Sequence, residues 1–161
     1  MGIEKKDSPF TKVIQVGIVV KDVEKTVKRL TSLGIGPFEP MVLPPERQEW
    51  FRDKRMYADF KIFGARIGDI QIELIQPISG DSPHKEFLET KGEGIQHIAC
   101  AVEDVEKEVQ KLTKEGATTL LRAKFPGGRG VAYMDLDAGG LIVELIQRRT
   151  EPTNPAESLN L

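Results

Sequence analysis

Four polar side chains stand where the sequence pattern predicts buried strands. Glu73 lies within IQIELIQ (residues 70–76) and Glu144 within LIVELIQ (141–147), and both are flanked by aliphatic residues. Gln15 lies within VIQVGIVV and His97 within IQHIACAV. A buried carboxylate without a partner is very costly, so such a group is usually paired or bound to a metal. One imidazole, two carboxylates and one amide oxygen suit a divalent cation that accepts nitrogen and oxygen ligands.

These donor types narrow the choice of cation without fixing it. The set contains no thiolate, so a structural zinc site is not expected. Cobalt, nickel, manganese and catalytic zinc stay open, with one or two coordination positions left for water or substrate. Taken singly, a strand glutamate more often faces solvent, and a strand histidine is more often a hydrogen-bonded core residue. The alternative for the four together is a cleft that binds a ligand without a metal.

An internal repeat relates the four residues to one another. KDVEKTVKRLTSLG at 21–34 and EDVEKEVQKLTKEG at 103–116 are identical at eight of fourteen positions, with an offset of 82 residues. Gln15 and His97 are separated by the same 82 positions. Glu73 and Glu144 are equivalent at an offset of 71, so the first copy carries 11 additional residues between its helix and its last strand. A pseudo-twofold pairing of the copies would bring all four side chains together.

Each copy predicts a strand, a helix and three further strands. The β-rich runs at 13–20 and 95–102 predict the first strands. Asp22 and Asp104 stand at helix N-cap positions, and Gly34 and Gly116 at helix ends. The further strands are expected near 39–43, 57–64 and 69–77 in the first copy, and near 118–122, 130–136 and 141–148 in the second.

We therefore predict an α+β fold in which two tandem βαβββ modules form a curved mixed sheet around a metal cleft. The modules span 12–77 and 95–148. The linker at 78–94 contains a short helix over about 83–91, at whose start His84 is expected to be exposed. The C-terminal tail at 149–161 has little apolar content and is expected to be loosely ordered.

The bulk composition excludes several classes of protein. A net charge of -2 over 161 residues argues against a general nucleic-acid binder, which would carry a basic excess. No apolar run approaches the roughly 18 residues of a membrane span, and no secretory signal is evident. The single cysteine, Cys100, cannot form an internal disulfide. We expect a cytoplasmic protein without a nucleic-acid or membrane partner.

Residues 12–148 resemble the vicinal oxygen chelate superfamily, which includes glyoxalase I, methylmalonyl-CoA epimerase, extradiol dioxygenases and bleomycin-resistance proteins. The stretches IELIQPISGDSPHKEFLETKGEGIQHIACAV and GGLIVELIQ are most similar to the epimerase branch. The resemblance implies one divalent metal ion (Co, Ni, Mn or Zn) bound by Gln15, Glu73, His97 and Glu144. It also implies a small acyl thioester or ketone substrate, with methylmalonyl-CoA as the leading candidate, and it allows a homodimer.

The sequence departs from the epimerase pattern at Gln15, where epimerases usually have histidine. The resulting ligand set is similar to that of certain glyoxalase I enzymes, so a lactoylglutathione lyase is the alternative enzyme. The glutathione-binding positions of those enzymes are occupied here by Val19, Pro77 and Glu93, which disfavours glutathione recognition. A non-catalytic binding member of the superfamily is the third alternative.

The shared chemistry of the superfamily implies proton removal α to a carbonyl, with the metal stabilising the resulting enolate. The resemblance assigns the base to Glu144. For the second acid or base, Glu73 is one candidate, and Asp59 and Lys61 in YADFKIFG are the others. The enlarged segment 37–56 is expected to be a loop and is a candidate lid, in which Trp50 and Phe51 would cover an acyl group and Arg47, Arg52 and Arg55 would contact phosphates. The first expectation, however, is that most of these arginines are solvated and that Trp50 has a packing role.

Overall fold

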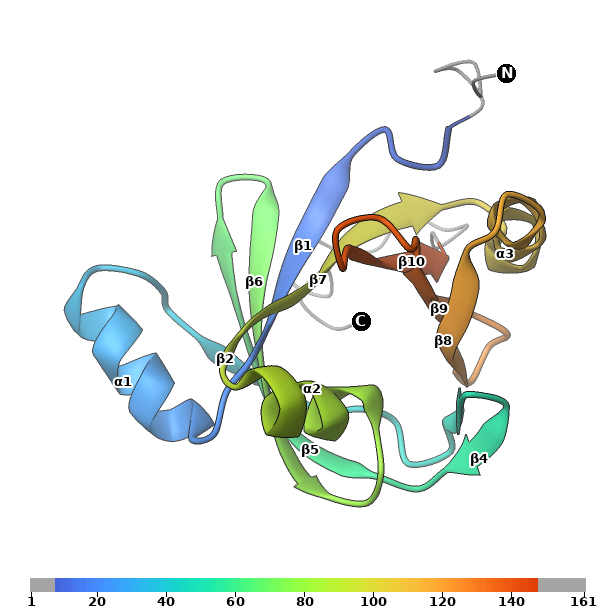
Figure 1. Ribbon diagram of the computed structural model, residues 1–161. Helices are drawn as coiled ribbons and strands as arrows, with labels where there is room; N and C mark the ends of the chain where they lie inside the picture. Colours follow the sequence, from blue (N-terminus) through green and yellow to red (C-terminus); the bar gives the residue numbers. More distant parts are fainter. Residues whose placement is uncertain (1–7, 148–161) are drawn as a thin grey trace.

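The computed structural model describes residues 8–147, which form three helices and one curled ten-stranded sheet (Figure 1). The predicted α+β class and the curved mixed sheet are confirmed. The strand order is β2-β5-β6-β1-β7-β10-β9-β8-β3-β4. The pairs β1–β6 and β7–β10 are parallel, and the others are antiparallel. The tail at 149–161 and the last residue of the expected second module lie outside the described residues.

The two modules are equivalent four-stranded units that meet at one strand pair. The first consists of β1 (Val13–Val19), α1 (Val23–Ser32), β2 (Glu39–Met41), β5 (Asp59–Ile67) and β6 (Ile70–Ser79). The second consists of β7 (Gly94–Val102), α3 (Val105–Lys114), β8 (Thr118–Lys124), β9 (Gly130–Asp135) and β10 (Ile142–Gln147). From the central antiparallel pair β1–β7, the order β1-β6-β5-β2 mirrors the order β7-β10-β9-β8. This seam is where the two copies of the repeat bring their polar residues together.

Helices α1 and α3 lie at opposite ends of the molecule and cover one face of the sheet (Figure 1). The side chain of Asp22 accepts a hydrogen bond from the Lys25 amide, and that of Asp104 accepts one from the Lys107 amide, both at 3.0 Å. The predicted N-caps are therefore confirmed. The apolar stripe of α3 packs on alternate residues of β10, including Val143 and Leu145. Because strand side chains alternate between faces, this packing turns Glu144 towards the opposite, concave face.

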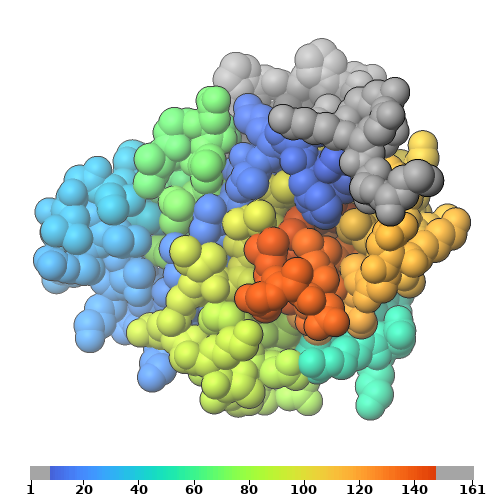
Figure 2. Space-filling model, turned by 45° about the horizontal axis from the view of Figure 1, so that its top comes forward, coloured from blue at the N-terminus to red at the C-terminus, as the bar shows by residue number. Residues whose placement is uncertain are grey.

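Part of the enlarged segment of the first module is not a loop but forms two further strands, β3 (Gln48–Phe51) and β4 (Lys54–Met56). Strand β3 pairs with β8 of the second module, so the β3–β4 hairpin extends the far edge of the sheet. Figure 2 shows this teal segment lying against the orange segment of the second module, as it does in Figure 1. The insertion thereby closes the concave face from the side opposite the seam. Its action as a lid stays a prediction.

Helix α2 (Pro83–Lys91) has the bounds predicted for the linker helix. Ser82 caps it by accepting a hydrogen bond from the Lys85 amide at 3.1 Å. The prediction that His84 is exposed is wrong, because its side chain is buried in the first turn of α2, between the rings of Phe60 and Tyr133. Within residues 8–147, no helix combines the length and apolar character needed to cross a membrane.

The two N-caps generate a stability prediction. Replacing Asp22 or Asp104 by alanine should lower the free energy of unfolding by about 1 kcal/mol each, because one helix amide loses its acceptor. Urea unfolding followed by circular dichroism measures this change. The exposed mid-helix substitution Lys28→Ala serves as the control and should leave stability nearly unchanged. Equal effects of the cap and control substitutions would contradict the capping role.

Candidate metal centre

Gln15, Glu73, His97 and Glu144 lie together on the concave side of the seam. They come from β1, β6, β7 and β10, the four central strands, and each is between 1% and 5% exposed. The Nε2 atom of His97 lies 3.2 Å from Oε2 of Glu144 and 3.7 Å from Oε2 of Glu73. One ligand atom from each of these three residues lies within 4.8 Å of the other two. The structure therefore brings together the residues that the repeat predicted to meet.

The donor atoms of this cluster suit a divalent cation. Among the described residues, Gln15 Oε1, His97 Nε2 and Glu144 Oε2 are buried and have no hydrogen-bond partner. Buried polar atoms are otherwise nearly always paired, because an unpaired one costs about 1–3 kcal/mol. All three atoms can offer a lone pair, and Glu73 adds a further carboxylate beside them. A metal ion accepts lone pairs from several directions at once, so these residues fit a metal-binding role.

A glycine makes room for the histidine ligand. Gly17 of β1 is paired with Glu73 on one side and with His97 on the other. A Cβ atom at position 17 would overlap the ring of His97 at Cε1, Nε2 and Nδ1. The imidazole thus lies directly over the backbone of the neighbouring strand. Glycine inside a strand often marks such a close approach.

One β-bulge directly precedes the first ligand of each module. The register of β1 and β7 shifts between Val13 and Gln15 and again between Gly17 and Ile18, which leaves Ile14 and Gln96 as the additional residues. Bulges redirect side chains and are common beside functional sites. Because of the bulge in β7, the consecutive residues Gln96 and His97 are both buried. Simple strand alternation would have placed them on opposite faces.

A narrow cavity of about 50 Å³ opens beside the cluster. Its polar lining includes Glu73 and Glu144 and also Glu49 of β3, which is 8% exposed. Arg47 donates a hydrogen bond to Glu49 at 3.0 Å. Burial raises the pKa of Glu49, and the positive charge of Arg47 opposes this rise. Three carboxyl groups therefore face one small space.

Glu49 is a site residue that the sequence analysis missed. It lies in the insertion, where the repeat offers no counterpart for comparison. Only its place beside Trp50 and Phe51 in a short strand could have indicated it. Of the residues proposed as the second acid or base, Asp59 accepts a hydrogen bond from Ser79, and Lys61 pairs with Glu24 on the surface. Neither Asp59 nor Lys61 is among the residues that line the cavity.

Tyr133 and His84, two ring-bearing residues that line the cavity, are uncharged near neutral pH. The ring of Tyr133 lies 4.7 Å from that of His97, and the ring of His84 lies 5.5 Å from that of Tyr133. Burial, followed by the charges of Glu144, Glu73 and Glu49, raises the pKa of Tyr133 well above its usual value. Burial and the nearby His97 lower the pKa of His84 to about 3, although its hydrogen bond to Gln96 opposes the shift. Neither Tyr133 nor His84 therefore offers a positive charge to the neighbouring carboxyl groups.

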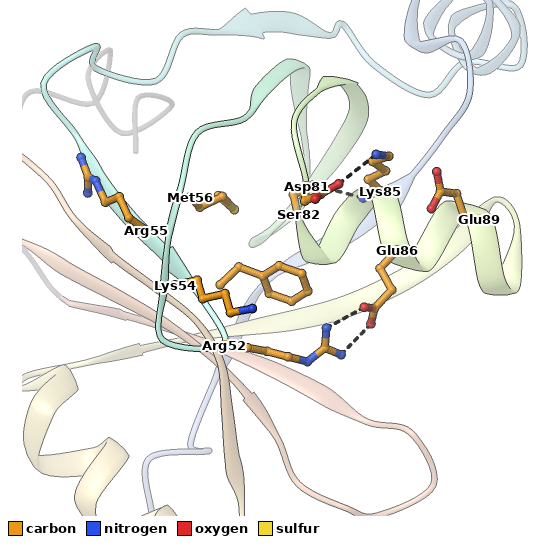
Figure 3. Close-up of a pocket in the computed structure, with 10 residues that line it drawn as sticks. Arg52, Lys54, Arg55, Met56, Asp81, Ser82, Lys85, Glu86 and Glu89 are labelled. Carbon is orange, nitrogen blue, oxygen red and sulfur yellow. Dashed lines mark hydrogen bonds and ion pairs between the residues drawn. The ribbon is translucent and has the colours of Figure 1, made fainter.

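A larger pocket of about 530 Å³ lies between the β3–β4 hairpin and α2 (Figure 3). Arg52 and Glu86 point towards each other across it and form two hydrogen bonds of 2.6 and 2.7 Å. Arg55 stacks on the rings of Trp50 and Tyr57. Arg52 is thus engaged within the protein, and Arg47 is engaged with Glu49. Contact of these arginines with phosphate groups stays a prediction.

Comparison with known proteins identifies the relatives of this chain. Residues 14–134 match the family described as the Glyoxalase/Bleomycin resistance protein/Dioxygenase superfamily. The uncharacterized protein YqjC of Bacillus subtilis is 31% identical over 93 residues, which cover 56% of this chain and 66% of YqjC. The mitochondrial methylmalonyl-CoA epimerase of Homo sapiens is 28% identical over 137 residues, which cover 82% of this chain and 71% of the epimerase. The matches thus span about two thirds of these relatives.

Solved structures share the fold. A hypothetical protein from Bacillus halodurans superposes with a TM-score of 0.67 at 25% identity, covering 89% of this chain and 98% of its own. A Streptomyces coelicolor methylmalonyl-CoA epimerase in complex with 2-nitronate-propionyl-CoA superposes with a TM-score of 0.62 at 20% identity. That match covers 89% of this chain and 99% of the epimerase. At these identities, the epimerase likeness establishes the fold.

The close approach at Gly17 generates a prediction about the ligand cluster. Gly17→Ala should displace the His97 ring, weaken binding of Zn²⁺ and lower the free energy of unfolding by roughly 1–3 kcal/mol, as overpacking usually does. Calorimetric titration with Zn²⁺ and urea unfolding measure the two effects. Gly130→Ala is the matched control, because a Cβ there meets no atom closer than 3.5 Å. Unchanged Zn²⁺ affinity in Gly17→Ala would contradict the placement of His97.

The carboxyl pair generates a pH prediction for the metal-free protein. Burial, and then the charge of Glu144, raise the pKa of Glu73 well above its ordinary value of 4.5. The folded chain therefore retains this proton at pH values where the unfolded chain releases it, so the contribution of Glu73 to stability falls as the pH rises above 4.5. Thermal unfolding of chelator-treated protein should show this decline, and Glu73→Gln should flatten it. An identical pH profile in the two proteins would contradict the raised pKa.

Proposed function

Because the chain belongs to the glyoxalase/bleomycin resistance/dioxygenase superfamily, we propose that it is a metal-dependent isomerase that moves a proton α to a carbonyl, with an acyl-CoA thioester such as methylmalonyl-CoA as substrate. The observation that carries this proposal is that Glu73 and Glu144, which cluster with His97, line one small cavity together with the carboxyl group of Glu49. The sequence similarity to methylmalonyl-CoA epimerases of human, mouse and cattle supports the substrate class.

Gln15, Glu73, His97 and Glu144 would hold the metal. A divalent cation bound there would supply Lewis-acid stabilisation of the negative charge that develops on a substrate carbonyl when the α-proton leaves. The apolar surroundings of the four residues exclude water and so strengthen their electrostatic effect on a bound substrate. Gln15 adds a neutral donor, which limits the number of negative charges that meet in this small space.

Glu144 and Glu49 have separate roles in the proposal. An epimerisation needs one group to remove the α-proton and another to return a proton to the opposite side of the planar intermediate. Glu144 reaches the cavity from β10, whereas Glu49 reaches it from β3, with β9 and β8 between them in the sheet. The two carboxyl groups can thus contact a substrate from different directions. The raised pKa of Glu49 suits a group that must carry a proton in one half of the cycle.

The cavity limits how a substrate enters. A volume of about 50 Å³ accommodates little more than one or two water-sized groups. Phe125 and Arg129, which line it, belong to the segment between β8 and β9, next to Gly127 and Gly128. An acyl group therefore requires these rim side chains to move outwards. The glycines give that segment the backbone freedom for such a movement.

The donor set also favours a second candidate, a lactoylglutathione-lyase-like enzyme. One glutamine, two glutamates and one histidine form a ligand set similar to that of certain glyoxalase I enzymes. At the expected glutathione positions, however, Val19 is fully buried, and Glu93 accepts a hydrogen bond from the Lys21 amide. Neither side chain offers a cation to a glutathione carboxylate. The isomerase is therefore the first choice.

Exchange of the C2 proton of methylmalonyl-CoA with solvent deuterium tests the isomerase. Protein loaded with cobalt, nickel, manganese or zinc should catalyse exchange in both epimers. Glu144→Gln and Glu49→Gln should each slow epimerisation by about 10²–10⁴-fold, the usual contribution of a general acid or base. Each variant should still exchange the one epimer whose proton faces the remaining carboxylate.

Glu46→Gln is the matched control, because Glu46 lies in the same segment as Glu49 but is exposed. This variant should retain full activity. Absence of exchange with all four cations would contradict the proposed function. Full epimerisation by Glu49→Gln would remove Glu49 from the mechanism and leave Glu73 as the second group.

A further inference from the structure

Gln96, the bulged residue of β7, makes three hydrogen bonds through one buried amide. Its Nε2 donates to the carbonyl oxygen of Pro83 at 3.0 Å. Its Oε1 lies 2.7 Å from Nδ1 of His84 and 3.1 Å from Nδ1 of His97. An amide oxygen has two lone pairs and can accept both of these bonds. Gln96 therefore joins the linker helix to a proposed metal ligand.

The carbonyl of Pro83 fixes the direction of every bond in this group. A carbonyl oxygen only accepts hydrogen bonds, so the amide must turn its NH₂ group towards Pro83 and its oxygen towards the two imidazoles. An amide oxygen can only accept as well, so Nδ1 of His97 must carry a proton. A neutral imidazole protonated at Nδ1 has its lone pair on Nε2. That is the atom of His97 that faces Glu73 and Glu144.

Gln71 orients the side-chain amide of Gln15 in the same way. Nε2 of Gln71 lies 3.8 Å from the sulfur of Met41, which is an acceptor in this geometry. Oε1 of Gln71 therefore faces Gln15 and accepts a hydrogen bond of 2.7 Å from its Nε2. With its NH₂ group engaged, Gln15 keeps Oε1 as its available acceptor atom, and that atom is buried and unpaired. Gln15 and His97 thus each keep a buried, unpaired lone pair, on Oε1 and on Nε2.

We propose that Gln71 and Gln96 are positioning residues that orient Gln15 and His97, so that Oε1 of Gln15 and Nε2 of His97 keep their lone pairs for a cation. Each glutamine donates to an acceptor, Met41 for Gln71 and Pro83 for Gln96, and its oxygen therefore faces one ligand. This inference rests on the proposed metal site but makes a separate claim, that the orientation exists before any metal binds. Partners that orient metal ligands in this way commonly change metal affinity 10–100-fold when they are removed.

The repeat supplies the appropriate substitutions. The residue equivalent to Gln96 in the first module is Ile14, the other bulged residue, and the residue equivalent to Gln71 in the second module is Ile142. Both isoleucines pack against one hydrophobic cluster on the concave face. Each glutamine thus stands where the other copy of the same structural unit has an isoleucine. Gln96→Ile and Gln71→Ile consequently suit the local backbone.

Nuclear magnetic resonance of the imidazole nitrogens tests the orientation in metal-free protein. The chain has only two histidines, so its long-range proton–nitrogen spectrum is simple to assign. At mildly alkaline pH, both rings should be protonated at Nδ1. In Gln96→Ile, the proton of His97 should move to Nε2, because Glu144 and Glu73 then offer the nearest acceptors. A His97 that lacks the Nδ1 proton in the unaltered protein would overturn the proposal.

Competition for Zn²⁺ with a chromophoric chelator tests the consequence of this orientation for metal affinity. Gln71→Ile and Gln96→Ile should each bind Zn²⁺ about 10–100-fold more weakly than the unaltered protein. Gln76→Ile is the control on the same strand as Gln71. Its side chain accepts a hydrogen bond from the Val23 amide instead, so it should change stability but not affinity. Equal Zn²⁺ affinity in all three variants and the unaltered protein would refute the positioning role.

The two measurements separate this inference from the proposed function. If the unaltered protein bound no divalent cation, the proposed metal site would fail. The proton positions of the imidazoles would still confirm or refute the orientation by Gln96. If the protein bound Zn²⁺ tightly but His97 carried its proton on Nε2 before metal was added, the metal site would stand and the positioning role would fail.

Discussion

The structure depends on one constraint: several oxygen and nitrogen atoms that carry lone pairs lie close together in an apolar interior. Gln15 Oε1, His97 Nε2 and Glu144 Oε2 are buried without hydrogen-bond partners, and Glu73 lies beside them. Carboxylates in such surroundings must gain protons or a counter-ion, because the low dielectric gives little other compensation. In the metal-free chain, the raised pKa of Glu73 means that this carboxyl group gains a proton. A bound cation is the other response, and the proposed chemistry follows from it.

Duplication explains how so unfavourable a cluster can be assembled. Each module contributes one residue from its first strand and one from its last, and the β1–β7 seam places these strands side by side. The helices then cover the convex face, where Leu74, Val143 and Leu145 pack, so their strand neighbours must point into the cleft. Symmetry is broken where function requires it. The insertion adds Glu49 from β3, and the glutamines at 71 and 96 replace isoleucines of the other copy.

The sequence alone predicted the repeat, the helices with their caps, the α+β class and the set of four residues that meet. These features follow from local periodicity and from matched spacing, which one chain is enough to reveal. The sequence could not predict Glu49, because the insertion has no second copy for comparison and its pairing with β8 is long-range. It also placed His84 on the surface, since the burial of α2 depends on the curvature of the sheet. Gln96 was missed because a bulge breaks the strand alternation on which such predictions rely.

The central claim is that one cation joins the two modules through their repeat-related side chains. The most direct measurement is anomalous scattering from crystals of zinc-loaded protein, collected on both sides of the zinc absorption edge. The account predicts one peak about 2.0–2.2 Å from Gln15 Oε1, His97 Nε2 and a carboxylate oxygen of both Glu73 and Glu144. A zinc-soaked crystal with no peak among these atoms, and with the carboxyl groups hydrogen-bonded to each other or to water, would contradict it.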